Sequence, residues 1–449
     1  MRDMGRGRSL RVHPDFIIEL REVIDRNKYQ NQQKFADKAG VKREIVSNFL
    51  TGKPVDKWLF AKICKELKRD PQEIADLEDL SNSSDSHQDS DEEAGDTASP
   101  GNFEAEYPEG SLPLDSPFYI ERPPIETSCY AAIIQAGALL RIKASQKMGK
   151  TLLLEQVLNY SRKQGYQTVK LDLRLAEKNI LADYQTFLQS LCLEVAETLE
   201  LDAKLNHYWR ELYGLNKNCT RYWQKYLLPT IGTPVVLALD NFERLFAYPE
   251  LFENFCCLLR GWYELGKQGS KVGQIWQRMR LVVVYSTEVY PKLDTNYSPF
   301  NVGVPIDLPE LKKEQVAALA QHHKLETELS EAGLQELMEL VGGHPYLLEQ
   351  AFSALSHQNL SLEQLLRLAP TEEGIYRTHL HQQLWQLQHH PRLETGYKKV
   401  VMASEPVPLN AEEGFKLHSL GLVKLSRNHY FPSCNLYRRY FSARLSSTL

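Results

Sequence analysis

The sequence lacks the features that mark several classes of protein. No apolar run approaches the roughly 20 residues that a membrane-spanning helix needs, so we expect no membrane domain. The seven cysteines include no CxxC pair and are odd in number, which disfavours a zinc site and a disulfide framework. No apolar segment follows the charged start, MRDMGRGRSL, so we expect no secretory signal and a reducing, cytoplasmic environment.

Charge is distributed unevenly along the 449 residues. Lysine and arginine are absent between Arg69 and Arg122, a stretch that carries 16 acidic residues. Residues 1–69 carry 17 basic and 9 acidic side chains, a net charge of +8. Since the whole chain has a net charge of −5, residues 122–449 have a net charge of +3. A chain of this length is also too long for a single core. We therefore expect a basic head, an acidic linker and a nearly neutral body of several domains.

The acidic linker is predicted over residues 76–115. Its central part, residues 79–110, is rich in serine, aspartate, glutamate, glycine and proline and poor in aliphatic residues. Such a segment buries too little apolar area to offset the entropy of ordering it, which predicts disorder. Two interpretations stay open: a plain flexible connection, or a segment that competes with nucleic acid for the basic head.

The head, residues 1–75, shows a pattern typical of a helix-turn-helix. Phe35 and Ala36 mark one short helix, and Ala39-Gly40-Val41 supplies a tight turn. Ile45, Phe49 and Leu50 then follow at helical spacing, and Gly52 ends the second helix. In this motif the second helix enters the major groove of DNA.

The stretch VSNFLTGKPV, residues 46–55, resembles the end of the recognition helix in the repressor-like helix-turn-helix family. The resemblance implies a set of residues that would face base edges, namely Lys42, Arg43, Glu44, Ser47 and Asn48. It also implies lysines near the phosphates, namely Lys34, Lys53 and Lys57. The alternative is that the head is a protein–protein adaptor whose lysines are simply solvated.

The body contains a candidate phosphate-binding loop in LLRIKASQKMGKTLLLEQ, residues 139–156. Gly149-Lys150-Thr151 match the end of such a loop, whereas Ala144 stands where a glycine is usual. A predicted strand precedes the loop and a predicted helix follows it, at residues 138–142 and 151–161. Backbone N–H groups of residues 145–150 would cradle phosphates, Lys150 would reach the outer ones, and Thr151 would hold magnesium. Ala144 adds only a methyl at the entrance of the loop, which weakens the match without excluding it.

A buried strand that ends in an acid is the second requirement of such a site. Residues 235–239 form a continuous apolar run followed by Asp240, which would bind the magnesium shell through water. Two further predicted strands, residues 168–172 and 281–286, fit the same sheet. The strands and the helices between them predict a doubly wound parallel α/β sheet that binds a nucleotide with Mg²⁺.

With these motifs in place, the body resembles the cyanobacterial AAA-like ATPase family, within the STAND class of signal-transducing P-loop NTPases. The resemblance rests on several blocks in order: SPFYIERPPIE (116–126), RIKASQKMGKT (141–151), LALDNFERLF (237–246), RLVVVYSTEVY (280–290), SPFNVG (298–303), GGHPYLL (342–348) and NLYRRYFSARL (435–445). It implies that the segment from Tyr119 to Arg122 packs near the adenine. It also implies that Gly343-His344-Pro345 begins a helix that reports the state of the nucleotide. His344 would contact a phosphate or merely sit in the turn that starts this helix.

The predicted fold class is therefore multidomain. An α-helical helix-turn-helix head at residues 1–75 and the linker precede a P-loop NTPase core with a parallel doubly wound sheet at residues 116–310. A helical domain at 311–385 and a C-terminal winged helix at 386–449 follow. In the last domain, GLVKLSRNHYFP predicts two strands around a turn at residues 426–428.

The sequence departs from the pattern at the catalytic position. Members of the class usually carry an acid directly after the magnesium-strand aspartate, where this chain has Asn241. An amide orients water but takes no proton, so we expect slow hydrolysis or none, and a gain in turnover in Asn241→Glu. Glu243 would substitute if the turn is bent suitably, or else would pair with Arg244. No arginine ends the strand at residues 281–286, where many STAND proteins use one to read the outer phosphate.

Three functions follow from these expectations. The first is an ATP-controlled switch that acts on a DNA-binding head, as a transcriptional or mobile-element regulator. The second is a defence-type sensor or adaptor whose head recruits a protein partner. The third, an ATPase motor, is disfavoured by Asn241. STAND relatives often assemble when loaded with ATP, which favours a nucleotide-dependent homo-oligomer.

Overall fold

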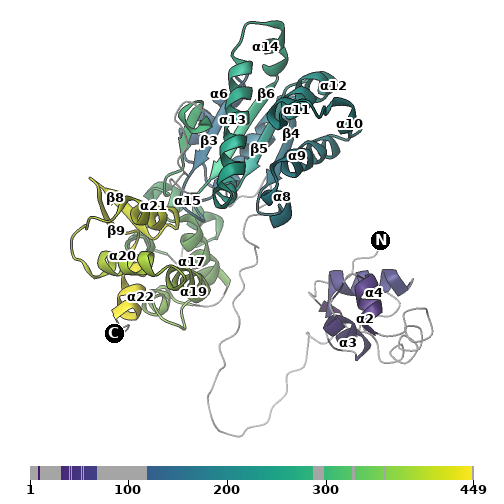
Figure 1. The fold of residues 1–449 in the computed structure, drawn as a ribbon. Coiled ribbons are helices and arrows are strands. Elements are labelled where there is room, and N and C mark those ends of the chain that lie inside the picture. The colour runs from purple at the N-terminus through teal and green to yellow at the C-terminus, as the bar shows by residue number, and fades with distance from the viewer. Residues whose placement is uncertain are drawn as a thin grey trace. The chain divides into compact units, whose positions relative to one another are not determined.

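The computed structural model describes residues 9–10, 32–39, 41, 43–51, 53, 55–67, 119–286, 298–325, 329–357 and 360–446. The chain divides into two compact units, Met1–Ala98 and Ser99–Leu449 (Figure 1). Across these described ranges, every helix is too short or too polar to span a membrane.

The first unit is built from short helices around an aromatic core. Its elements are α2 (Gln32–Ala39), α3 (Arg43–Leu50), α4 (Lys57–Leu67) and the antiparallel pair of β1 (Ser9–Leu10) with β2 (Val55–Asp56). Phe49 of α3 packs on Phe60 of α4 with ring centroids 4.9 Å apart, and both side chains are fully buried. The two helices that the sequence predicts correspond to α2 and α3.

A five-stranded parallel sheet forms the centre of the second unit. Its strands are β3 (Leu139–Lys143), β4 (Gln167–Asp172), β5 (Val235–Asp240), β6 (Met279–Tyr285) and β7 (Val304–Asp307), in the order β4-β5-β6-β3-β7. All four neighbouring pairs are parallel, so the predicted parallel α/β core is confirmed. Strand β7 was not predicted from the sequence. Its four residues, VPID, form an edge strand that is mostly exposed and therefore carries no apolar run.

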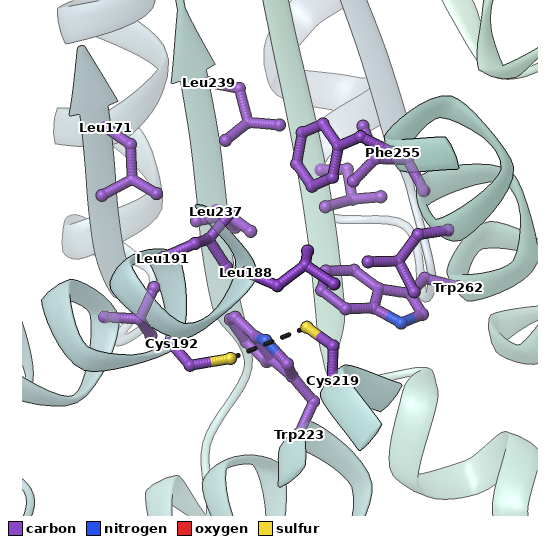
Figure 2. Packing of buried hydrophobic residues seen from close by; sticks show 14 of the residues in the cluster. Leu171, Leu188, Leu191, Cys192, Cys219, Trp223, Leu237, Leu239, Phe255 and Trp262 are labelled. Atoms are coloured by element: carbon purple, nitrogen blue, oxygen red, sulfur yellow. Dashed lines mark hydrogen bonds between the residues drawn. The ribbon is translucent and has the colours of Figure 1, made fainter. Parts of the chain in front are cut away.

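Helices cover both faces of this sheet because alternate residues of each strand point to opposite sides. One face packs on α6 (Ile125–Ile133) and α7 (Lys150–Lys163). The other face packs on α9 (Tyr184–Thr198), α11 (Leu215–Tyr222) and α13 (Pro249–Gly266). Figure 2 shows this second layer, where Leu188 and Phe255 lie over Leu237 and Leu239 of β5.

Shorter elements complete the sheet domain. They are α8 (Lys178–Ala182), α10 (Leu205–Tyr208), the π-helical turn η2 (Trp223–Leu227), α12 (Leu228–Ile231), the 3₁₀ turn η3 (Phe242–Ala247), α14 (Lys271–Trp276) and η4 (Pro299–Asn301). Trp223, Trp262 and Trp276 form a buried row of tilted rings in this layer, with neighbouring ring centroids 5.2 Å and 5.4 Å apart.

Among the described residues after the sheet domain, the regular elements are helices and one hairpin. We call α15 (Lys313–His322), α16 (Glu331–Val341), α17 (Pro345–His357), α18 (Leu362–Leu368) and α19 (Arg377–Gln388) the helical module. The C-terminal module consists of α20 (Pro391–Met402), α21 (Ala411–Ser419), β8 (Val423–Ser426), β9 (His429–Pro432) and α22 (Asn435–Ser446). The two modules share one hydrophobic core.

The β8-β9 hairpin lies where the sequence predicts a turn. Arg427 and Asn428 both have positive φ, at 47° and 67°, as a two-residue turn of this kind requires. Tyr437, Tyr440 and Phe441 of α22 are buried in the shared core, as the sequence analysis predicts.

Candidate phosphate-binding site

The candidate loop, residues 144–149, connects the carboxyl end of β3 to the first turn of α7. Gly149 precedes the helix with φ at +91°, which glycine adopts readily. A Cβ atom at this position would lie 2.9 Å from Nη2 of Arg122. The loop therefore needs glycine here both for its backbone conformation and for the space beside Arg122.

Lys150 folds back over the loop. Its Nζ donates hydrogen bonds to the carbonyl oxygens of Ala144, at 3.1 Å, and Ser145, at 2.7 Å. Burial lowers the pKa of Lys150 to about 8, while the carboxylates of Glu243 and Asp240 oppose the shift. The ammonium thus lies on the side of the loop that faces the two carboxylates.

Thr151 and Asp240 form the predicted hydroxyl–carboxylate pair. Thr151 Oγ1 donates to Asp240 Oδ2 at 3.2 Å. Asp240 is 1% exposed, and burial raises its pKa although Lys170, with Nζ 3.9 Å away, lowers it. A buried carboxylate beside a hydroxyl at a helix start could hold a magnesium ion directly or through water.

Asn241 links the ends of two strands. It lies in the left-handed region with φ at 55°, and its N–H donates to Asp240 Oδ1 at 2.9 Å. Its Nδ2 donates to Oδ1 of Asp172, the last residue of the neighbouring strand β4, at 2.9 Å. Burial raises the pKa of Asp172, but hydrogen bonds from Arg174 and Asn241 outweigh it and hold the pKa below its ordinary value.

The turn at Asn241 directs Glu243 toward the end of β6. Ser286, the residue after β6, donates a hydrogen bond from Oγ to Glu243 Oε1. Oε2 of Glu243 is buried and, among the described residues, has no hydrogen-bond partner. Glu243 also contributes to the electrostatics of Lys150, so its carboxylate shares the site with the lysine. The sequence offered two possibilities for Glu243, and the structure gives it Ser286 as a partner.

Tyr119 and Arg122 are held by one carboxylate. Glu126 accepts hydrogen bonds from Tyr119 Oη, at 2.8 Å, and from the backbone N–H of Arg122, at 2.9 Å. Arg122 is 6% exposed and its Nη1 donates to the carbonyl oxygens of Met148, at 2.9 Å, and Pro309, at 3.0 Å. Arg122 thereby links the candidate loop, through Met148, to the segment after β7, through Pro309.

His344 lies beside the loop at the start of α17, which Pro345 begins. It is 5% exposed, and its Nδ1 has no hydrogen-bond partner within the described part of the chain. Burial, with the nearby charges of Lys147 and Lys424, lowers the pKa of His344 to about 3, so the ring is neutral at pH 7. The ring lines a cavity of about 220 Å³ together with Ser145 and Met148 of the loop.

The C-terminal module contacts the loop directly, which no local sequence pattern predicts. The backbone N–H of Gln146 donates to the carbonyl of Ser419 at 3.1 Å, and Ser145 Oγ donates to the carbonyl of His418 at 2.9 Å. These carbonyls belong to the last residues of α21, at the negative end of its dipole. One of the N–H groups expected to face phosphate is therefore bonded to a helix end.

Lys147 connects the same loop to the helical module. Its Nζ lies 4.0 Å from the centroid of the Tyr346 ring and 3.4 Å from Nδ1 of His379. His379 Nε2 is in turn 2.7 Å from the hydroxyl of Tyr437 in α22. The loop thus contacts both modules that follow the sheet domain.

The candidate DNA-contacting residues lie in the first unit. Arg43 is exposed on α3, and Lys34 and Lys53 are exposed as well. The carbonyl of Asn48 accepts hydrogen bonds from the N–H groups of Thr51 and Lys53, so its backbone ends the helix. Lys42 and the side chains of Glu44, Ser47 and Lys57 lie outside the described residues.

The residues around the loop fit a nucleoside triphosphate with a magnesium ion. Gly149 leaves the space that a Cβ would fill, Lys150 lies over the loop, and Thr151 pairs with the buried Asp240. The buried, unpaired oxygen of Glu243 is placed to accept a hydrogen bond from a water. In the described ranges, no group of three or more histidine, cysteine, aspartate or glutamate side chains could hold a metal by itself.

Comparison with known proteins gives a family match. A model of the AAA-like domain family matches residues 107–443. No curated protein matches the chain. Similar solved structures include a Walker-type ATPase of Pyrococcus abyssi, with 10% identity, a TM-score of 0.49 and coverage of 72% of this chain and 96% of that chain. Cdc6p of Pyrobaculum aerophilum shows 15% identity, a TM-score of 0.39 and coverage of 74% and 97%.

Proposed function

The chain belongs to the family of proteins with an AAA-like domain, and from this premise we propose that it binds ATP with Mg²⁺ as a nucleotide-controlled switch. The observation that carries the proposal is the arrangement at the start of α7. Lys150 lies over the loop, and Thr151 donates a hydrogen bond to the buried Asp240. A strand–loop–helix with this lysine and this hydroxyl–carboxylate pair is the arrangement that P-loop proteins use for a triphosphate and its metal.

Each residue of the site has a defined task in this proposal. Gly149 lets the backbone approach the phosphates, and Lys150 exchanges its carbonyl partners for their oxygens. Thr151 and Asp240 hold the magnesium ion, which would neutralise charge on the phosphates. Glu243 orients a water molecule and accepts its proton, while Asn241 keeps the ends of β4 and β5 together. Because Glu243 is two residues beyond the usual position of the acid, we expect hydrolysis to be slow.

The switch follows from competition for the loop. Gln146 donates its backbone N–H to Ser419 at the carboxyl end of α21, and a phosphate would need the same N–H group. Phosphate and the helix end are both negative, so they repel each other at this short range. We propose that bound nucleotide displaces the end of α21 and shifts the C-terminal module, which we interpret as the winged helix of a STAND-type protein.

For the head, we propose a helix-turn-helix that binds DNA, with α3 as the recognition helix. The exposed Arg43 and Lys53 and the positive charge of residues 1–69 support this function. The protein would then be a transcriptional or mobile-element regulator. The alternative is a defence-type sensor whose head recruits a protein. DNA binding by the full chain that weakens steeply with salt would favour the first function over the second.

A matched pair of lysine variants tests nucleotide binding. In Lys150→Met, we expect the affinity for MgATP in calorimetry to fall at least about 30-fold, because a charge-assisted hydrogen bond of ~2 kcal/mol is lost. Lys163→Met, at the exposed end of the same helix, is the control and should bind like the unaltered protein. Equal binding by the two variants would overturn the proposed site.

A further inference from the structure

A cavity of about 220 Å³ lies where the sheet domain, the helical module and the C-terminal module meet. Ala144 and Ser145, at the start of the phosphate loop, form one wall, and Ser286, after β6, forms another. His344 of the helical module and Lys424 of β8, in the C-terminal module, also line this cavity. The cavity thus adjoins the proposed phosphate site at the carboxyl end of the sheet.

The cavity contains a polar group that lacks a partner. Nδ1 of His344 is buried without a hydrogen bond within the described residues, although the side chain is 5% exposed. Leaving such a group unpaired costs free energy, so a water or a ligand must complete it. A neutral imidazole has one N–H, and the ring makes backbone hydrogen bonds with Gln146 and with His344 itself, so a water in the cavity would donate to Nδ1.

Lys424 brings a positive charge to the same cavity. Its Nζ donates to Oε2 of Glu310 at 2.8 Å, and the two side chains are 35% and 29% exposed. Ion pairs with this degree of exposure contribute little net free energy, so a stronger anion can replace the carboxylate. The same oxygen of Glu310 also accepts the backbone N–H of Gly343 at 3.3 Å, which gives Glu310 a second partner if Lys424 leaves.

Among the described residues, the end of β6 supplies no cation. Ser286 follows the strand, whereas Arg278 and Arg280 lie at its opposite end. The Arg280 guanidinium donates to the backbone carbonyls of Ile133, Ile134 and Gln277, away from the phosphate loop. A terminal phosphate in the cavity would meet the charge of Lys424 across the boundary between modules.

On the basis of the proposed nucleotide site, we propose that Lys424 binds the terminal phosphate of ATP and thereby distinguishes ATP from ADP. Without a terminal phosphate, Lys424 keeps its ion pair with Glu310. With ATP, the ammonium moves to the phosphate. Because a terminal phosphate carries about two negative charges and the carboxylate carries one, the exchange favours the ATP-bound protein.

The contact between Lys424 and the phosphate would hold the C-terminal module in a position in which α21 no longer contacts the loop. Lys424 lies in β8, a few residues after the end of α21 that contacts Gln146. A bound triphosphate breaks the contact of α21 with the loop and makes a new contact with β8. ADP would break the first contact without making the second.

Calorimetric titration of the full chain with MgATP and with MgADP tests the role of Lys424. We expect the unaltered protein to prefer MgATP and Lys424→Met to lose about tenfold in MgATP affinity with MgADP affinity unchanged. The matched control is Lys416→Met in the same module, whose exposed lysine pairs with Glu412 and should affect neither ligand. Thermal unfolding of each variant checks that the fold is intact.

A second variant keeps the test informative if Lys424→Met is unfolded. In Glu310→Gln the carboxylate that competes for Lys424 is neutral, so MgATP should bind about threefold more tightly while MgADP is unaffected. Equal changes for the two nucleotides, or no change in either variant, would overturn the assignment of Lys424 and leave the nucleotide site in place. Failure of the unaltered protein to bind either nucleotide would instead overturn the proposed function.

Discussion

At the scale of single residues, the backbone conformation of Asn241 decides where Glu243, the proposed catalytic carboxylate, lies. Its left-handed conformation precedes the 3₁₀ turn in which Glu243 accepts a hydrogen bond from Ser286. The side-chain amide of Asn241 donates a hydrogen bond to Asp172. A glutamate at position 241 would stand next to Asp172 and repel it. The gain in turnover that the sequence suggests for Asn241→Glu is therefore not expected from the structure.

Glu243→Gln tests this assignment. The substitution keeps the size of the side chain and an oxygen that can accept the hydrogen bond of Ser286, but it removes the base. We expect MgATP hydrolysis, measured as phosphate release, to fall at least about 100-fold. MgATP affinity should stay within about threefold of the original, since the phosphates are held by other groups.

Glu253→Gln, on the exposed side of α13, is the control for the loss of one negative charge. Phosphate release by Glu243→Gln at the same rate as by this control would show that another group acts on the water.

At the scale of elements, the candidate loop and the end of α21 are joined by hydrogen bonds that a bound nucleotide could break. Two hydrogen bonds between described residues join them, one from Ser145 Oγ to the carbonyl of His418 and one from the N–H of Gln146 to the carbonyl of Ser419. The next element of the same module carries Lys424. One short segment, residues 418–424, therefore contains both the carbonyls that bond to the loop and the lysine that we propose binds the terminal phosphate.

Ser145→Ala removes one of the two bonds without affecting a group that the proposal assigns to phosphate. Because a neutral hydrogen bond contributes about 1 kcal/mol, the closed arrangement should weaken and MgATP should bind up to about fivefold more tightly. Calorimetry measures the change, with Ser442→Ala on the exposed face of α22 as the control. Weaker binding in Ser145→Ala would show that α21 supports the nucleotide and does not compete with it.

At the scale of the whole molecule, the sequence predicted the sheet better than the connections across it. The strands that contain Leu237 and Val283 are apolar runs buried on both faces, so composition alone locates them. Gly149, Lys150 and Asp240 were predicted as site residues because the chemistry of a phosphate site requires those residue types. By contrast, Gln146–Ser419 and Glu310–Lys424 join residues far apart in the chain, and no local pattern specifies such contacts.

The position of Glu243 lies between these cases. The sequence shows that Glu243 lies three residues after Asp240. The direction in which its side chain points depends on the positive φ of Asn241, which the sequence does not determine. Asparagine is several-fold enriched in that conformation, which was the available signal. The exposed strand β7 was missed for a similar reason, because an edge strand needs no apolar run.

We propose that a nucleotide bound at the candidate loop releases the end of α21. Amide hydrogen exchange of the full chain, measured with and without MgATP, tests this release. We expect slower exchange in residues 145–150 and faster exchange in residues 411–421 when MgATP is added, and neither change in Lys150→Met. If the loop is protected while exchange in residues 411–421 is unchanged, nucleotide binds without moving the C-terminal module, and the proposed release is wrong.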